Sequence, residues 1–369
     1  MNSGAGDGEI VRVETYVVER TGGTPYRWRR GMAPRTGTRF DAYVRLVTRG
    51  GIDGWAEIGY YGLPAATIVE RMMAPYLLGR DVLRTEDLWQ AVCDLDRGEA
   101  YPSWVFGAMD IAAWDAKGKY ANMPLYVMLG GARTEAPAYA SLTVMSSVAE
   151  YLDTATACVE AGFGAVKIHC AGEDWRKDAA LVRKLREAVG PGVHLMLDAA
   201  GAFDLVDARN VGKALDECEY YWYEEPISDF SLYAYQTLRR DLQTPLLGSE
   251  NSAGLHVNAG EWLVGQACDI LRIGADVKGG VTGSVRVAHL AESFEVRAEI
   301  AGGGPISEHL LCGLQNTTYH ETFVRSPADK DIEAAAALRV IRPSERPGIG
   351  VDFDLVWLAA NAVTRSVVE

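Results

Sequence analysis

Three carboxylates, Asp198, Glu224 and Glu250, each follow a short apolar run, and 26 residues separate each acid from the next. That interval is about the length of one strand, a loop, a helix and a loop back, which is the repeat of a parallel α/β barrel. Adjacent parallel strands lie roughly 4.8 Å apart, so acids at three successive strand ends can converge. Their mutual repulsion is removed by a hard divalent cation bound through oxygen. The pattern therefore predicts a metal site, and the alternative is three acids at loop starts with no common partner.

The elements that must position these acids follow from the pattern of apolar runs. From Ala136 onward, short apolar runs alternate with amphipathic helical stretches, which indicates parallel βα units. We expect eight strands, at 138–142, 165–169, 194–198, 221–224, 246–250, 270–274, 297–301 and 319–323, with helices such as 148–161 and 175–189 between them. Eight strands of this kind complete a barrel.

The N-terminal part of the chain has a different pattern. Residues 10–19 alternate like a strand, and 42–48 with 54–58 are typical of a hairpin, whereas helical periodicity dominates from 85 to 119. After about Asp331 the composition is mixed again, and a turn at 346–351 leads back toward the first domain. We predict an α+β domain at 1–130, a barrel with the metal site at 131–330, and a C-terminal segment at 331–369 that returns to the first domain.

Composition excludes several classes of protein. The chain has 369 residues and a formal net charge of −14, and nucleic-acid-binding proteins need a basic face that such a chain lacks. No run of 18 apolar residues and no basic and apolar leader is present, so we expect neither a membrane span nor a secretory signal. The six cysteines are scattered without a CxxC pair, which indicates neither zinc binding nor a disulfide framework. A cytoplasmic protein is expected.

At this point the chain resembles a known family along nearly its whole length. Residues 106–131, with Asp110, Asp115 and the Gly130-Gly131 turn, are similar to the N-terminal signature of the mandelate racemase and muconate lactonizing branch of the enolase superfamily. The three acids resemble its metal ligands, and the segment 347–351 fits its tail motif. The resemblance implies a modified (β/α)7β barrel under an α+β cap, Mg²⁺ at the strand ends, a homo-oligomer, and abstraction of the proton next to a carboxylate of a small substrate.

Lys167 and His169 stand where the family carries a Lys-x-Lys motif whose second lysine is the base. Strand alternation places both side chains on one face. Histidine acts as a base near neutral pH because its unperturbed pKa is about 6.5, and the lysine would neutralise an oxygen of the substrate carboxylate. A hydrogen-bonded core histidine is the alternative, but a barrel interior would not otherwise tolerate the lysine beside it. We therefore predict that His169 is the base.

The opposite side of the predicted site departs from the family. Mandelate racemase has an aspartate five residues before a Gly-Gly pair and a histidine on the next strand, and the corresponding positions here are Gly274 and Ala301. The lysine of the muconate lactonizing branch is replaced by Ile273. Neither known second base is present, so the sequence predicts a reaction with a base on one face only. Other ionisable residues in this region are Arg272, Asp276, Lys278 and Glu299, and the sequence does not decide which of them reaches the substrate.

Further residues are candidates for contacts with the substrate. Glu321 matches a family acid that hydrogen-bonds the substrate carboxylate, with a buried structural acid as the alternative. The loop 21–39 carries arginines interleaved with aromatic residues, and we predict a lid, poorly ordered without ligand, in which Arg27 and Arg29 bind a distal anion; a solvated basic loop is the alternative. Asn251 and Arg272 complete the predicted substrate-binding set.

Three functions remain open on the sequence. A dehydratase of acid sugars is favoured, because one base can remove the α-proton while a β-hydroxyl leaves. A cycloisomerase also needs only one base, whereas a racemase or epimerase needs groups on both faces, which argues against it. A non-catalytic descendant that kept the metal site is the third, and retention of Lys167 and His169 argues against it. The identity of the acid is not readable from the sequence.

Overall fold

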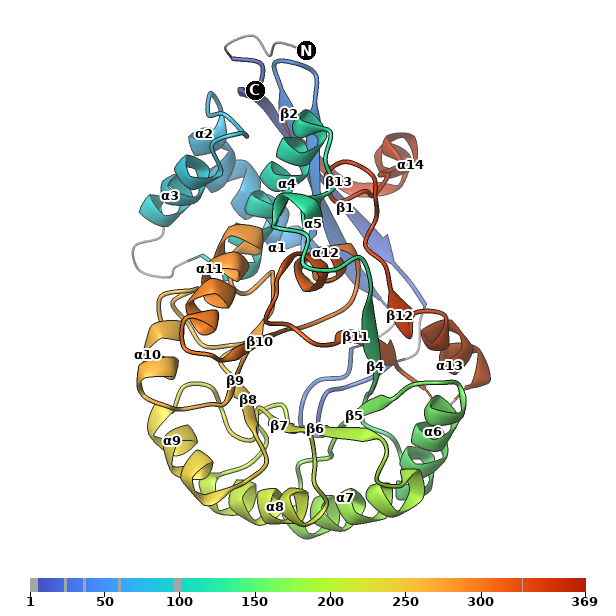
Figure 1. Cartoon of the computed structure of the whole chain (residues 1–369). Helices are drawn as coiled ribbons and strands as arrows, with labels where there is room; N and C mark the ends of the chain where they lie inside the picture. Colours follow the sequence, from blue (N-terminus) through green and yellow to red (C-terminus); the bar gives the residue numbers. More distant parts are fainter. Residues whose placement is uncertain (1–5, 23–24, 36–37, 59–60, 96–100, 327) are drawn as a thin grey trace.

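The computed structural model describes residues 6–22, 25–35, 38–58, 61–95, 101–326 and 328–369. Figure 1 shows a ring of strands surrounded by helices in the lower part of the molecule and a smaller sheet with helices above it. The first and last strands of the described chain lie side by side in the smaller unit. This is the modified barrel with an N-terminal α+β domain that the sequence predicted.

The sheet of the smaller unit has the strand order β13-β1-β2-β3. Its strands are β1 (Ile10–Arg20), β2 (Arg39–Thr48), β3 (Asp53–Ile58) and β13 (Ala362–Val368). The predicted hairpin is the β2–β3 pair, which is antiparallel and closes through the turn at Gly50 and Gly51. Because β13 pairs antiparallel with β1, the end of the chain is part of the first domain's sheet.

Helices pack on both faces of this sheet. They are α1 (Gly62–Ile68), a π-helical turn (Val69–Met73), α2 (Ala74–Leu77), α3 (Thr85–Leu95), α4 (Ser103–Ala121), α5 (Leu125–Met128) and, near the C-terminus, α14 (Leu355–Asn361). The longest, α4, is buried on most of its circumference because it lies between the sheet and the barrel, and such a helix carries apolar residues all round.

The barrel sheet is parallel and has the order β10-β9-β8-β7-β6-β5-β4-β11. Its strands are β4 (Ala136–Leu142), β5 (Ala165–His169), β6 (His194–Asp198), β7 (Trp222–Glu224), β8 (Leu246–Gly248), β9 (Ile270–Ile273), β10 (Arg297–Ile300) and β11 (His320–Val324). The connecting helices are α6 (Val148–Glu160), α7 (Trp175–Val189), α8 (Leu205–Glu217), α9 (Leu232–Asp241), α10 (Ala259–Val264), α11 (Gly280–Glu292) and α12 (Pro305–Gly313), followed by α13 (Asp329–Ala336) and the short β12 (Val340–Ile341), which pairs with β4. In the described chain this is a (β/α)7β arrangement.

Hydrogen bonds that involve side chains connect β10 and the loop after it with β11 and the segment before it. The Glu299 carboxylate on β10 accepts hydrogen bonds from the Thr318 backbone and hydroxyl, and the Gly302 N–H donates to Glu321 at 2.8 Å. The lower interior of the barrel is filled by a separate apolar cluster. Its members are Tyr139, Ala165, Met196, Trp222, Leu247 and Ile270. The polar site therefore lies above a closed apolar layer.

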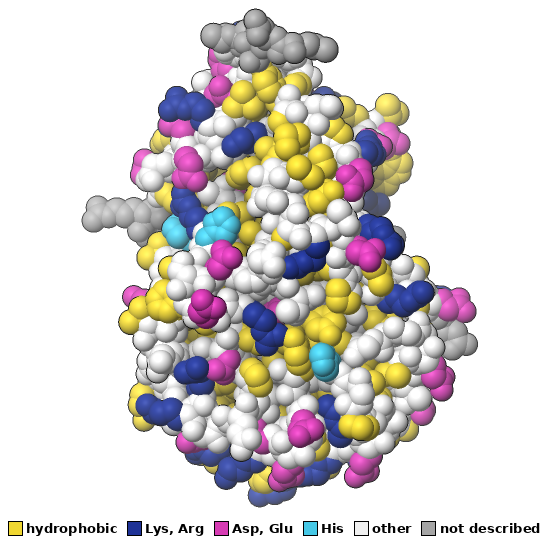
Figure 2. All heavy atoms as spheres, viewed as in Figure 1, with side chains coloured by type: hydrophobic (Ala, Val, Ile, Leu, Met, Phe, Trp, Pro, Cys, Tyr) yellow, Lys and Arg dark blue, Asp and Glu magenta, His cyan; other side chains and the backbone are white. Residues whose placement is uncertain are grey.

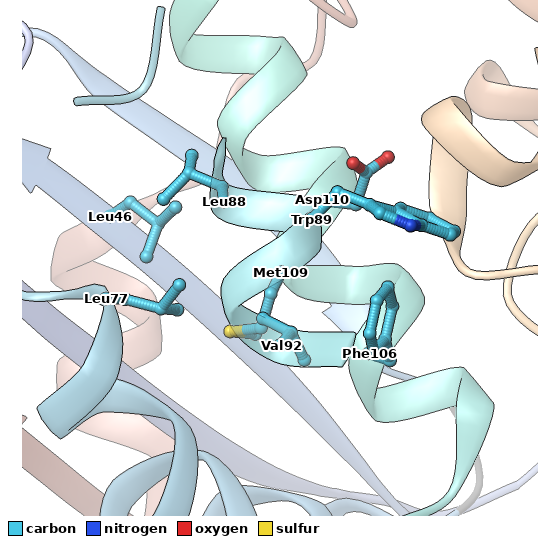
Figure 3. Close-up of a pocket in the computed structure, with 8 residues that line it drawn as sticks. All are labelled: Leu46, Leu77, Leu88, Trp89, Val92, Phe106, Met109 and Asp110. Carbon is cyan, nitrogen blue, oxygen red and sulfur yellow. The ribbon is translucent and has the colours of Figure 1, made fainter. Parts of the chain in front are cut away.

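Asp110 on α4 joins the cap to the barrel. Its carboxylate accepts hydrogen bonds from the Thr282 N–H at 2.8 Å and the Thr282 hydroxyl at 2.6 Å, both on α11. Figure 3 shows Asp110 beside Trp89 at the edge of an apolar pocket of about 10 Å³, which has room for about one water molecule and no substrate. Burial raises the pKa of Asp110 to about 7.

The structure is consistent with the composition, which argued against a nucleic-acid-binding protein and against a membrane span. In Figure 2, acidic and basic side chains are interspersed over the face in view, without a continuous basic stripe. Among the helices that the structure describes, none combines the length and the apolar character that crossing a bilayer requires.

Candidate active site at the strand ends

The strand ends bring the predicted residues into register. His169, Asp198 and Glu224 are the last residues of β5, β6 and β7, and the parallel pairing aligns His169 with Asp198 and Asp198 with Glu224. Glu250 follows β8 by two residues, after Ser249, whose φ of 76° turns the chain at the strand end. Because parallel strands present their carboxyl ends at one edge, all four side chains reach the mouth of the barrel.

Lys167 lies at the centre of this group. Its ammonium is 2.8 Å from Glu224, 3.2 Å from Asp198 and 2.8 Å from Glu321, and the side chain is 1% exposed. Although burial lowers it, the pKa of Lys167 is raised well above its ordinary value by Glu224 and Glu321. The lysine is therefore a fixed cation in the wall of the site.

Arg272 on β9 is a second buried cation. Its guanidinium lies 2.8 Å from Glu224 and 2.7 Å from Glu321, and it donates to the Tyr139 hydroxyl at 2.8 Å and to the Ile300 carbonyl at 3.0 Å. With 1% of the residue exposed, these partners occupy the guanidinium. The structure therefore places Arg272 as a support for the two glutamates rather than as a free group at the surface of the site.

The ring of His169 is held from three sides. Its Nδ1 atom is 2.9 Å from the Leu142 carbonyl oxygen, and its Nε2 atom is 3.0 Å from an Asp198 oxygen. The indole of Trp28 packs on the imidazole with ring centroids 4.7 Å apart. A carbonyl at Nδ1 can only accept a hydrogen bond, so Nδ1 carries the proton and Nε2 is the atom that exchanges one.

The charges of the site are not balanced by its own residues. Four carboxylates, those of Asp198, Glu224, Glu250 and Glu321, surround two fixed cations, so the formal sum is −2 with His169 neutral. Burial is the main cause that raises the pKa of Glu250 to about 8, and its nearest cation is Arg272 at 3.8 Å. For Asp198, burial acts in the same upward direction, but His169 and Lys167 lower the pKa below its ordinary value.

A hard divalent cation fits this donor set in type and in charge, because three carboxylates at one strand-end edge supply oxygen ligands and the site lacks two positive charges. Within the described residues, no three His, Cys, Asp or Glu side chains are already grouped around a single point. Lys167 lies between Asp198 and Glu224, and Arg272 lies between Glu224 and Glu250, so binding would draw these carboxylates away from the two cations.

A cavity of about 1230 Å³ opens above these residues. Its wall includes Lys167, His169, Asp198, Glu224, Glu250, Asn251, Arg272 and Glu321, so it unites the predicted base, the metal-binding acids and part of the predicted substrate-binding set. Trp28, Tyr61, Trp104 and Phe323 add aromatic surface, and Arg35, Arg325 and Lys330 add positive charge. Large aromatic surfaces with a few charged groups are typical of small-molecule sites.

The predicted lid arginines lie elsewhere. Arg27 and Arg29 are not in the cavity wall, and Arg29 donates to the Ala200 carbonyl at 3.0 Å. The described part of this loop is fixed to the barrel by backbone hydrogen bonds, from the Arg30 N–H to the Ala171 carbonyl at 3.0 Å and from the Val144 N–H to the Arg27 carbonyl at 3.2 Å. Residues 23–24 and 36–37 of the predicted lid lie outside the described residues.

Sequence reasoning missed several residues of the wall. Trp28 and Arg35 belong to the basic loop. The alternation of arginine with aromatic residues indicated that the loop could contact a ligand, but not which of its side chains point into the cavity. Arg325 follows the eighth strand directly, as Glu250 nearly follows the fifth, so its position at a strand end could have identified it. The contact of Trp28 with His169 joins segments 141 residues apart, and no local pattern reports it.

Known proteins resemble both parts of the chain. The family described as mandelate racemase / muconate lactonizing enzyme, N-terminal domain, matches residues 20–130, and the family described as enolase C-terminal domain-like matches residues 150–356. The crystal structure of D-glucarate dehydratase from Agrobacterium tumefaciens complexed with magnesium superimposes with a TM-score of 0.86 at 27% identity, covering 97% of this chain and 100% of that one.

Two characterised relatives are also similar over most of the chain. A D-galactonate dehydratase family member of Paenibacillus sp. is 27% identical over 350 residues, covering 80% of this chain and 85% of the relative. The 3,6-anhydro-alpha-L-galactonate cycloisomerase of Streptomyces coelicolor is 29% identical over 328 residues, covering 84% and 89%. With both domains matched and the strand-end acids in register, the chain belongs to the mandelate racemase and muconate lactonizing branch of the enolase superfamily, as its motifs predicted.

Proposed function

We propose that this protein is a Mg²⁺-dependent dehydratase that removes the α-proton of an acid sugar and expels its β-hydroxyl. The observation that carries the proposal is the setting of His169. Its Nδ1 proton is held by the Leu142 carbonyl, and its Nε2 atom is directed into the same cavity as four carboxylates with a formal surplus of two negative charges. The dehydratase relatives support this choice of reaction.

Asp198, Glu224 and Glu250 are proposed to hold the metal ion. When bound, Mg²⁺ supplies the positive charge that makes a proton next to a carboxylate acidic enough to remove. The chain's own contribution is to place three carboxylates at neighbouring strand ends and to keep two of them oriented through Lys167 and Arg272.

Lys167 is proposed to bind the substrate carboxylate, and Glu321, 2.8 Å from the ammonium, is proposed to hold it in position. The Lys167 ammonium is a donor fixed beside the site, and Glu321 is held 2.7 Å from Arg272 and 2.8 Å from the Ser141 hydroxyl. A fixed donor stabilises the charge that develops on a carboxylate oxygen without reorganising during the reaction. His169 then takes the α-proton on Nε2.

Recognition of the rest of the substrate is assigned to the upper wall. Asn251 keeps its place in the proposal, since it lines the cavity and its side-chain amide donates to Glu225 at 2.5 Å. The role first expected of Arg27 and Arg29 is better suited to Arg35 and Arg325, which do line the cavity. Arg272 is proposed to position Glu224 and Glu321 rather than to touch the substrate.

The experiment is turnover of D-galactonate, D-glucarate and D-gluconate, with and without Mg²⁺, followed by NMR of the products in D₂O. We expect a 2-keto-3-deoxy acid that forms only with metal. His169→Asn should abolish both dehydration and deuterium incorporation at the α-carbon. His320→Asn is the matched control, because His320 lines the same cavity while its Nδ1 lies 3.3 Å from the Thr322 hydroxyl.

A cycloisomerase is the second candidate, favoured by the similarity to the Streptomyces enzyme. Such a reaction also begins at the α-carbon but forms or opens a ring without net loss of water. Adding 3,6-anhydro-galactonate to the panel separates the two, because a product isomeric with its substrate would contradict dehydration.

We further propose that the protein works in the cytoplasm as a homo-oligomer. None of the six cysteines forms a disulfide in the described structure, which suits a reducing compartment. The side chains of Phe230 and Tyr233 near α9 are 82% and 72% exposed, as expected of a surface that a second copy covers. Light scattering of the purified protein would give the mass, and a monomer at micromolar concentration would contradict the assembly.

A further inference from the structure

The side of the barrel opposite His169 carries a carboxyl group that the family pattern does not contain. His169 ends β5, and β9 stands opposite β5 because three strands separate them in either direction around the ring. Asp276 lies three residues after the end of β9, and it lines the same cavity as His169. A substrate in the cavity is therefore flanked by His169 on one side and Asp276 on the other.

The Asp276 carboxylate lies beside the space that a side chain at position 274 would occupy. A Cβ atom built on Gly274 would lie 3.2 Å from an Asp276 carboxylate oxygen, 3.1 Å from a Glu250 oxygen and 2.7 Å from a Val277 methyl. A larger residue at 274 would collide with this arrangement. The carboxyl that mandelate racemase attaches to the strand is thus replaced, at nearly the same place, by one that reaches back from the following loop.

The carboxyl group of Asp276 is available for chemistry. Its Oδ1 accepts the Val277 N–H at 3.0 Å, and it forms no ion pair with a described residue, in contrast to Asp198, Glu224 and Glu321. The side chain is exposed to the cavity, and a substrate that covered it would desolvate the carboxyl and so favour its protonated form. A protonated carboxyl is a donor as well as an acceptor.

We propose that Asp276 is the general acid of the reaction, donating a proton to the β-hydroxyl as it leaves on the face opposite His169. This inference rests on the proposed dehydratase function. His169 Nε2 takes the α-proton, the C–H electron pair forms the α,β double bond, the β-carbon–oxygen bond breaks, and the hydroxyl leaves as water with the Asp276 proton. The resulting enol becomes the 2-keto acid, and both side chains recover their starting protonation by exchange with solvent.

The test compares two leaving groups in Asp276→Asn. Protonation is required for hydroxide to leave but much less so for fluoride. With the best acid sugar of the panel, we expect Asp276→Asn to lose about 10²–10⁴-fold in kcat, the usual contribution of a general acid. With its 3-deoxy-3-fluoro analogue, fluoride release should stay close to that of the wild type. Asp276→Glu should restore part of the dehydration, and Glu308→Gln, which removes another carboxyl from the same cavity wall, should leave it nearly unchanged.

Three results would overturn the inference. Asp276→Asn could dehydrate the hydroxyl substrate at nearly the wild-type rate, which would show that no proton comes from this side chain. It could lose fluoride release and α-deuterium exchange together, which would indicate a structural role. It could bind Mg²⁺ more weakly in calorimetry, which would place Asp276 in the metal site. If instead the wild-type protein neither dehydrates nor exchanges any acid of the panel, the proposed function itself fails.

Discussion

Lys167 and Glu224 form an ion pair of 2.8 Å in which each side chain is 1% exposed. Glu224 has a second buried cation on its other oxygen, since the Arg272 guanidinium is also 2.8 Å away. Glu250 has no comparable partner, because Arg272 lies 3.8 Å from it and a quarter of its side chain is exposed. Glu224 and Glu250, two of the proposed metal ligands, therefore differ in how much they stabilise the folded protein when no metal is bound.

This difference predicts that two similar substitutions destabilise the protein to different extents. Glu224→Gln leaves Lys167 and Arg272 short of a carboxylate, and breaking a buried pair in this way costs about 3–5 kcal/mol of unfolding free energy. Glu250→Gln should cost less than about 1 kcal/mol, as for a partly exposed pair. Both should weaken Mg²⁺ binding by at least about 10-fold, since loss of a ligand exceeds the loss of an outer hydrogen bond.

Denaturant unfolding with EDTA and calorimetric titration with Mg²⁺ separate these two effects. Unchanged Mg²⁺ affinity in Glu250→Gln would remove that residue from the proposed metal site, whatever its stability.

At Gly280 the barrel backbone lies so close to α4 of the first domain that one added methyl group should destabilise the protein. Gly280 begins α11 with φ +83°, and a Cβ there would lie 2.6 Å from an Asp110 oxygen and 2.7 Å from the Gly107 carbonyl. Gly280→Ala should lose about 1–3 kcal/mol from strain at positive φ and a further ~1–3 kcal/mol from overpacking. Gly190→Ala is the control, since its φ is +75° but nothing lies within 4 Å of the added methyl. Equal melting temperatures for the two variants would contradict this account.

The Asp110 carboxyl predicts a pH dependence of stability. Its folded pKa of about 7 is above the unfolded value near 3.9, so the folded state keeps a proton that the unfolded state has released. The stabilisation is complete at low pH and is lost as the pH rises toward 7, by no more than ~1.4 kcal/mol per pH unit. Asp110→Asn cannot ionise, and the difference in unfolding free energy between wild type and variant should therefore change across pH 4–7 and level off above it. A constant difference over that range would mean that Asp110 does not titrate there.

The sequence predicted those parts of the molecule that local patterns determine. Each barrel strand is an apolar run, and the regular spacing of these runs predicted the barrel. The acids at 198, 224 and 250 each stand at the end of such a run, so their position at the strand ends followed from the same pattern. The family resemblance added the capping domain, whose hairpin and long helix carry regular periodicities.

What the sequence did not predict depends on contacts between distant segments. The sequence predicted that the tail returns to the first domain, but nothing in its composition identified β1 as the strand with which β13 pairs or placed Val368 opposite Val13. The inward or outward direction of the loop arginines is set by backbone hydrogen bonds such as that of Arg30 to Ala171, which propensity does not report. The sequence also did not indicate that Arg272 pairs with Glu224 and Glu321, because a lone arginine on an apolar strand does not identify its partners.

The last prediction concerns recognition of the distal end of the substrate. The Arg325 guanidinium lies 5.2 Å from the ring of Tyr26 and 5.5 Å from that of Phe323, at the upper wall of the cavity, and no carboxylate of a described residue pairs with it. A substrate with a second carboxylate could gain a charge-assisted hydrogen bond there, worth about 1.5–3 kcal/mol. Arg325→Gln should then raise KM for D-glucarate by roughly 10–100-fold, the factor to which that energy corresponds, while KM for the monoacid D-gluconate changes little. Arg29→Gln should alter neither value, since Arg29 is not in the cavity wall and its guanidinium is engaged by the Ala200 carbonyl. If Arg325→Gln raises both KM values equally, the arginine contributes only a general positive field, and the distal carboxylate must be read by another group of the wall.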